Sequence, residues 1–202
     1  MKSKKVLIII STVFLLRVII SCCDCVEPVE HKYSIEYISV YNLDNSGQNP
    51  IISETNIVPS KAYGIQIDFS LIQVAINQTN TFTIFPEASA FDCFCPPSLQ
   101  YTAKDSIISL DITTINSFDS QHPSDSDVSN LFKVLYHNSY ITLQNYIKQP
   151  QVVYLFEKPE KVTLSLFLLQ PPEILGEHIF NIGITLSDHR FLTMTTNPVT
   201  LQ

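Results

Sequence analysis

The chain has 202 residues, of which 45% are hydrophobic and 15% charged, and its formal net charge is −7. This acidic balance argues against a nucleic-acid partner, which requires a basic surface, and against docking on anionic lipid head groups. Only four glycines are present, so no glycine-rich phosphate loop is expected, and the length is sufficient for one domain with a substantial core.

The first 21 residues predict an export signal. A basic start (MKSKK) precedes an apolar stretch that is interrupted by Arg17 and is shorter than the roughly 20 apolar residues of a membrane-spanning helix. The stretch ends in residues 19–22 (IISC), which resemble the bacterial lipobox of an aliphatic, a variable and a small residue before a cysteine. The resemblance implies that the signal is removed and that the thiol of Cys22 is lipidated. An ordinary secretory signal or an uncleaved anchor is the alternative.

Removal of the signal changes the charge balance, because four of the 12 basic residues lie within it. Residues 22–202 retain 8 basic and 19 acidic residues, a net charge of −11. Solubility is the simplest role of this acidity, since no calcium-binding loop pattern is present. Residues 22–32 are expected to form a lipidated tether, and residues 33–202 the folded domain. Several acyl chains on one cysteine satisfy the rule that stable anchoring takes more than one chain.

Four further cysteines form two C-x-C pairs, at Cys23, Cys25, Cys93 and Cys95. An exported protein enters an oxidising compartment, where disulfides are the default, and a bridge within C-x-C is hard to close. Cross-pairing would close loops of about 70 residues and stabilise the fold, with three connectivities left open. Free thiols are the next alternative. The tight spacing argues against a four-thiolate zinc site, and neighbouring carboxylates, which raise a thiol pKa, argue against a redox role.

Four segments in the first part of the chain have the composition and alternation of β-strands, namely residues 33–41, 63–69, 81–86 and 105–115. The second of them places four large side chains on one face: Tyr63, Ile65, Ile67 and Phe69. In the fourth, Ile108, Leu110 and Ile112 are expected to face inward. Residues 87–98, which carry the second cysteine pair, and residues 116–130 predict loops.

The hydrophobic period then changes to that of a helix. Five apolar side chains follow the i, i+3, i+4, i+7, i+8 spacing: Val128, Leu131, Phe132, Leu135 and Tyr136. Candidate N-caps lie at residues 125–127, and residues 139–148 predict a second short helix. Residues 131–136 also have the composition of a strand, so both alternatives stay open.

Strand signals close the chain at residues 161–169, 178–187, 190–196 and 198–202. The second of them points four apolar side chains inward: Phe180, Ile182, Ile184 and Leu186. Asp188 and His189 predict a tight turn into the third, and Pro198 marks the last as an edge strand. The pattern predicts a mainly β fold, a two-sheet antiparallel sandwich with one or two short helices between strands.

Three stretches carry a family resemblance: residues 21–25 (SCCDC), residues 127–132 (DVSNLF) and the closing hairpin of residues 176–188. Through them the chain resembles a group of small Bacteroidota lipoproteins of unknown function with an immunoglobulin-like β-sandwich. The resemblance covers most of the mature chain, and His189 departs from it because such hairpins usually carry glycine there. It implies an envelope location and a sandwich, and it supplies no activity.

The start of the mature chain also bears on location. Three acidic residues follow the lipid site, Asp24, Glu27 and Glu30. Similar acidic starts act as surface-export signals in Bacteroidota, so the resemblance implies an outer-membrane protein on the cell surface. The periplasmic face of that membrane is the alternative.

No catalytic constellation, metal site or cofactor site is recognisable in the sequence. The G-x-S-x-G and H-E-x-x-H patterns do not occur, and the five histidines are scattered. His178 follows Glu177 directly, and we interpret it as a surface or capping residue. Residues 105–107 (DSI) resemble the three-residue O-glycosylation signal of Bacteroidota envelope proteins, which makes Ser106 a candidate modification site.

These features favour a lipid-anchored, non-enzymatic binding or structural module at the outer membrane, with a protein or glycan as its partner. One alternative is an envelope enzyme, for example acting on glycans, whose site is assembled from distant residues. Another is a thiol or metal protein that uses the C-x-C pairs. A cleft with converging titratable groups would favour the enzyme, whereas a flat or strand-edge surface would favour the binding module.

Overall fold

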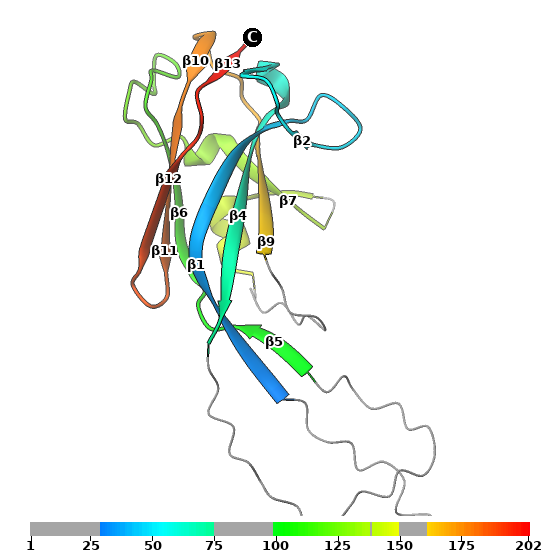
Figure 1. Cartoon of the computed structure of the whole chain (residues 1–202). Coiled ribbons are helices and arrows are strands. Elements are labelled where there is room, and N and C mark those ends of the chain that lie inside the picture. The colour runs from blue at the N-terminus through cyan, green and yellow to red at the C-terminus, as the bar shows by residue number, and fades with distance from the viewer. Residues whose placement is uncertain (1–28, 75–98, 138, 150–160) are drawn as a thin grey trace, which may run out of the picture.

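The computed structural model describes residues 29–74, 99–137, 139–149 and 161–202 (Figure 1). The expected signal, all five cysteines, the strand expected at 81–86 and the loop expected at 87–98 lie outside these ranges. The described residues form a β-sandwich with one short α-helix, which confirms the predicted fold class. None of the helices in this part of the chain is long and apolar enough to cross a membrane.

The first layer of the sandwich is a seven-stranded sheet. Its strands are β1 (Val29–Asp44), β2 (Ile51–Ile52), β4 (Tyr63–Gln73), β5 (Leu99–Ala103), β7 (Phe132–Tyr136), β8 (Ser139–Thr142) and β9 (Lys161–Leu168). They follow the order β2-β1-β4-β9-β7-β8, and β5 pairs with the beginning of β1. Each of these pairs is antiparallel except that of β1 and β5, which is parallel.

The second layer consists of two three-stranded sheets that are arranged end to end. The larger contains β6 (Ile107–Thr114), β11 (Phe180–Leu186) and β12 (Phe191–Thr195), in the order β12-β11-β6. The smaller contains β3 (Ile57–Val58), β10 (Gly176–His178) and β13 (Val199–Leu201), in the order β10-β13-β3. Because β10 leads into β11 and β12 into β13, the small sheet continues the same layer.

The core lies between the two layers and contains the side chains that alternation predicts. In β4 the four predicted residues, from Tyr63 to Phe69, are all buried, and in β11 so are the four from Phe180 to Leu186. An aromatic cluster joins the layers: the ring of Phe180 lies 5.5 Å from that of Tyr63 and 5.6 Å from that of Phe132. Burial of such large rings is the main stabilising contribution to a sandwich of this size.

Strands β1 and β5 extend beyond the sandwich as a narrow stem. They leave it at the end opposite the C-terminus (Figure 1), and their register places Val29 opposite Leu99 and Tyr33 opposite Ala103. The rings of His31 and Tyr101 stack on this stem with centroids 5.3 Å apart. Since β1 already begins at Val29, four residues of the expected tether belong to the folded domain.

Of the two alternatives left open for residues 131–136, the helix is wrong and the strand is confirmed. Residues Ser129–Leu131 form a 3-10 turn, η2, and the following residues form strand β7. In β7 Phe132 and Val134 are buried whereas Leu135 is 47% exposed, which is strand alternation. The helical spacing arose because a buried turn happens to precede a strand. The strand is favoured by hydrogen bonds from two neighbours, namely β8, the next strand along the chain, and β9, which is distant in the sequence.

Three further expectations need correction. Ile108 does not face inward but is 52% exposed, because an irregularity in the pairing of β6 with β11 brings Ile107 inward in its place. The second expected helix begins only after β8, as α2 (Leu143–Ile147). The last strand, β13, is not an edge strand, since it lies between β10 and β3.

Candidate functional site

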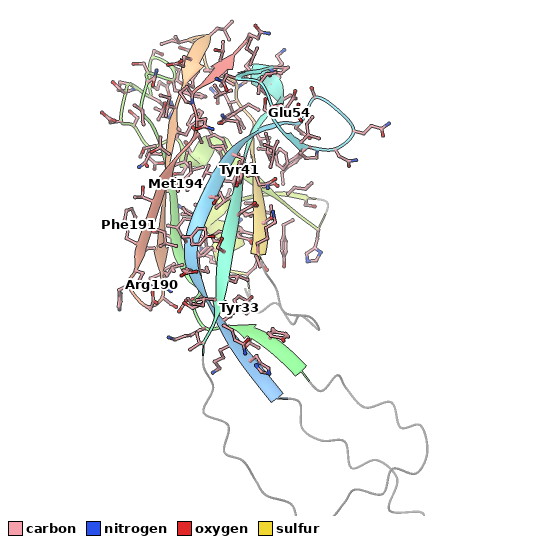
Figure 2. The ribbon with its side chains drawn as sticks, viewed as in Figure 1. Tyr33, Tyr41, Glu54, Arg190, Phe191 and Met194 are labelled. Carbon is pink, nitrogen blue, oxygen red and sulfur yellow. The ribbon has the colours of Figure 1, made fainter. Side chains whose placement is uncertain are left out.

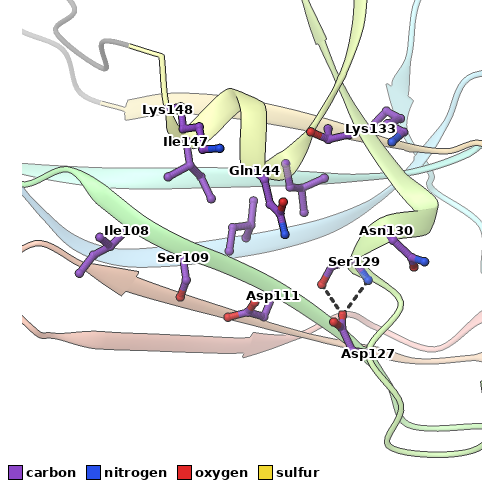
Figure 3. Close-up of a pocket in the computed structure, with 13 residues that line it drawn as sticks. Ile108, Ser109, Asp111, Asp127, Ser129, Asn130, Lys133, Gln144, Ile147 and Lys148 are labelled. Carbon is purple, nitrogen blue, oxygen red and sulfur yellow. Dashed lines mark hydrogen bonds between the residues drawn. The ribbon is translucent and has the colours of Figure 1, made fainter.

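A pocket of about 500 Å³ lies on one flank of the sandwich, between β6 and α2 (Figure 3). We call it the β6–α2 pocket. Its apolar lining comes from Ile108 and Leu110 of β6 and from Leu143 and Ile147 of α2. Its charged lining consists of Asp111, Asp127, Lys133 and Lys148. Apolar surface with a few placed polar groups is the usual composition of a ligand-binding site.

Helix α2 forms one wall of the pocket, and its sequence explains why a short helix forms there. The side chain of Thr142 accepts a hydrogen bond from the backbone N–H of Asn145 over 3.1 Å, which satisfies one free donor of the first turn. Leu143 is buried and anchors the helix to the core, while Gln144 points into the pocket (Figure 3). The helix therefore presents apolar and amide groups toward β6.

Among the described residues, most of the charged side chains that line the pocket have no ion-pair partner. Asp127 is engaged on one oxygen, which accepts from the backbone N–H of Ser129 over 2.8 Å and from its hydroxyl over 2.5 Å. In the described ranges Asp111, Lys133 and Lys148 form no ion pair. Charges of both signs are therefore free to meet a ligand that carries opposite charges.

The lining has the chemistry of recognition rather than of nucleophilic attack. Its described residues include three hydroxyl groups that are engaged with other protein atoms: the Ser109 hydroxyl donates to that of Thr185 over 2.9 Å, the Ser129 hydroxyl donates to Asp127, and the Thr142 hydroxyl accepts from the N–H of Asn145. Among the described residues that line the pocket, none is a histidine, and the cysteines lie outside the described ranges. The described residues also contain no group of three or more His, Cys, Asp or Glu side chains arranged to hold a metal ion.

A second polar cluster, at the base of the sandwich, has a structural role. The buried carboxylate of Asp105 accepts hydrogen bonds from Nη2 of Arg190 over 2.7 Å and from the hydroxyl of Ser34. Arg190 also donates to the C=O of Ile35 over 2.5 Å, and Figure 2 shows it beside β1 at the lower end of the β11–β12 hairpin. This cluster ties β1, the start of β6 and the hairpin together.

The candidate modification site lies next to that cluster. Ser106 is exposed, while the neighbouring Asp105 of the same three-residue pattern is 4% exposed. Ser187 forms two hydrogen bonds with the backbone of Ser106. The N–H of Ser187 donates to the C=O of Ser106 over 2.8 Å, and the N–H of Ser106 donates to the hydroxyl of Ser187 over 3.0 Å. Ser106 is therefore an exposed residue whose backbone is held in place by hydrogen bonds.

His178 is not a surface or capping residue, as the sequence interpretation had it, but a core residue. It is 1% exposed, and its ring lies 5.7 Å from that of Phe118 and stacks at 6.2 Å on that of Phe180. Its Nε2–H donates to the C=O of Ile174 over 2.8 Å, and its Nδ1 has no partner among the described residues. The alternation of β10 and β11, which puts residues 178 and 180 on one face, was the available signal.

The Ser- and Asp-rich loop after β6 is more ordered than its composition indicates. Asp119 is buried, and one of its oxygens accepts from the backbone N–H of Gln121 over 2.8 Å and of His122 over 2.7 Å. Burial raises the pKa of Asp119, but these hydrogen bonds and that from the His122 ring outweigh it and lower the pKa below its ordinary value. Asp119 therefore serves as a charged cap for its own loop.

The fold and the pocket together define a small β-sandwich domain with a polar-rimmed pocket on its flank. The chain belongs to a family described as a domain of unknown function, DUF5034, whose model matches residues 35–197. This confirms the expectation of a family without a known function, and the match includes every residue that lines the pocket. No curated protein and no solved structure matches the chain.

Proposed function

We propose that this protein is a lipid-anchored component of the outer membrane whose β-sandwich is a non-enzymatic binding module, with the β6–α2 pocket as its binding site. The observation that carries the proposal is the lining of that pocket, which combines apolar side chains with unpaired charges of both signs. Such a lining offers affinity and orientation to a ligand but places no nucleophile beside a base.

The geometry of the stem supports an anchor at the N-terminus. Cys22 precedes Val29 by seven residues, and Val29 begins the stem that leaves the sandwich opposite the C-terminus (Figure 1). A lipid on Cys22 would therefore attach the protein through its narrow end. The pocket, on the flank above the stem, would remain accessible to a partner.

Replacing Cys22 with alanine is expected to abolish metabolic labelling with a palmitate analogue and to release the protein from membranes, because the thiol that carries the lipid is lost. Cys23→Ala is the matched control, since it removes the adjacent thiol and should leave labelling unchanged. Labelling that persists in the Cys22 variant, or that is lost only in the Cys23 variant, would contradict the anchor assignment.

The acidic start of the mature chain supports exposure on the cell surface. Treating intact cells with a protease is then expected to remove the full-length protein, because the whole domain would lie outside the outer membrane. Lysed cells serve as the control for intrinsic susceptibility, and a periplasmic protein serves as the control for membrane integrity. Complete protection in intact cells, with degradation after lysis, would place the domain on the periplasmic face.

The stem supports cross-linking between the two cysteine pairs, because each pair shortly precedes one of its two strands. In the parallel pair of β1 and β5, Val29 lies opposite Leu99. Cys25 precedes Val29 by four residues and Cys95 precedes Leu99 by four residues. We propose that two disulfides join Cys23 and Cys25 to Cys93 and Cys95, and both cross-connectivities stay open.

Mass spectrometry of the non-reduced protein tests this cross-linking. Cleavage before Asp24 and after Phe94 separates the two cysteines of each pair, so each bridge joins a different pair of fragments and the digest also identifies the connectivity. We expect each cysteine of the first pair to be linked to one of the second, and a reduced digest as control should show no link. Links within a pair, four free thiols or stoichiometric zinc would contradict the proposed cross-linking, and the last two would favour a thiol or metal protein.

A further inference from the structure

The outer edge of β6 is partly occupied by the chain itself. At the C-terminal half of this strand, the N–H of Asp125 donates to the C=O of Thr114 over 2.7 Å, and the N–H of Val128 donates to the C=O of Ile112 over 2.8 Å. This segment runs antiparallel to β6. An extended backbone on this edge is therefore compatible with the packing of the sandwich.

The next outward-facing residue of β6 has no such partner among the residues that the structure describes. Along an antiparallel strand, the backbone N–H and C=O groups of successive residues point to opposite sides. Because the backbone groups of Ile112 and Thr114 point to the outer side of β6, those of Leu110 point there as well. Within the part of the chain that the structure describes, neither outward group of Leu110 has a hydrogen-bond partner, and the residue lines the pocket. An unpaired strand edge favours the addition of another strand.

The charged and apolar side chains that line the pocket are distributed along the direction of β6. Lys148 and Ile108 lie on opposite walls at one end of the pocket, whereas Asp111, Asp127 and Lys133 lie toward the other end, where two carboxylates accompany one lysine (Figure 3). The apolar side chain of Leu143 contributes to the lining from the facing wall. Alternate side chains of an extended peptide project to the same side. A basic, an apolar and an acidic side chain at alternate positions would therefore meet the two carboxylates of the net-negative end, the apolar lining and Lys148 in turn.

We propose that the β6–α2 pocket binds an extended peptide of a partner protein by antiparallel strand addition to β6 at Leu110. The peptide carries basic, apolar and acidic side chains at alternate positions, in that order from its N-terminus. Backbone hydrogen bonds to Leu110 contribute affinity, and the charged ends of the pocket set the direction. This inference rests on the proposed binding function and names the ligand class of the same site.

The test measures amide hydrogen exchange by NMR on the full-length chain, with the acetylated and amidated peptide Lys-Thr-Val-Thr-Glu as the probe. In the free protein, the amide of Leu110 should exchange much faster than that of Ile112, whose N–H donates to the hydroxyl of Ser129 over 2.7 Å. Saturating peptide should slow the exchange of Leu110 by about tenfold or more, because its N–H gains a partner.

Three controls isolate the backbone and charge contributions. A peptide methylated on every backbone nitrogen keeps its side chains but loses its donors, and it should bind at least about tenfold more weakly. The reversed peptide Glu-Thr-Val-Thr-Lys should also bind more weakly. Lys148→Glu should weaken binding of the original peptide, whereas Lys61→Glu, at an exposed position outside the pocket lining, should not.

Several outcomes would overturn the proposal. Binding that tolerates N-methylation and leaves Leu110 exchange unchanged would exclude strand addition while leaving the pocket as a binding site. A Leu110 amide that is already protected, and becomes exposed when residues 150–160 are replaced by a Gly-Ser linker of equal length, would assign the edge to the chain itself. Absence of peptide binding, or binding of an oligosaccharide in its place, would also exclude it. None of these outcomes depends on the Cys22 labelling experiment.

Discussion

Replacing Phe180 with alanine is expected to lower the free energy of unfolding by about 3–5 kcal/mol, because a fully buried aromatic ring is removed from the centre of the core. Phe180 is 0% exposed, and its ring lies 5.5 Å from Tyr63, 5.6 Å from Phe132 and 6.3 Å from Phe118. These rings come from both layers of the sandwich and from the loop after β6. The cavity that alanine leaves would therefore weaken the contact between the layers, not a single strand.

Equilibrium unfolding in urea, followed by circular dichroism, measures this loss. Phe191→Ala is the matched control, because Phe191 lies on the surface of β12 (Figure 2) and is 62% exposed. Its removal should cost much less, mainly the contact of its ring with Gly183. Equal destabilisation by the two variants would mean that the core does not centre on the aromatic cluster.

Replacing Asp105 with asparagine is expected to destabilise the protein by about 2–3 kcal/mol, since hydrogen bonds to a buried charged group contribute more than neutral ones. The Asp105 side chain is 1% exposed, and it is the shared acceptor for Arg190, for the hydroxyl of Ser34 and for the backbone N–H of Ile35. Asparagine keeps the shape but removes the charge. All three donors converge on Oδ2, so the amide oxygen of asparagine can take that place, but it carries no net charge and binds the guanidinium less strongly.

Asp188→Asn is the control for the loss of charge beside Arg190. Asp188 binds the same guanidinium through Nε over 2.6 Å but is exposed, so water replaces the lost interaction and the effect should be much smaller. The comparison also reports on the stem, because Asp105 holds β1 where it leaves the sandwich. Unfolding midpoints that respond equally to both variants would contradict a special role for the buried carboxylate.

The sequence by itself determined the elements whose pattern is local. In β4 and β11, every second residue is large and apolar, and both strands formed with those residues inward. The turn between β11 and β12 was also predictable, because Asp and His tolerate the left-handed backbone, and His189 has φ of 69°. The family without known function likewise followed from short stretches of sequence.

Only the tertiary structure decided the features that depend on partners distant in the chain. Residues 132–136 became a strand of the large sheet because β9 pairs with them, Ile108 turned outward because of an irregular register with β11, and β13 became central through β3. His178 shows the same dependence, since its neighbours in space make it a core residue.

The candidate site had no local signal for the same physical reason. Asp111 and Lys133 are ordinary charged residues of their strands, and nothing in their spacing predicts that α2 closes a pocket above them. Likewise, alternation along β6 predicts which side chains of the strand are buried, but not whether its edge is paired. Alternation is a property of one strand, whereas pairing, register and pockets arise from contacts between segments that lie far apart in the sequence.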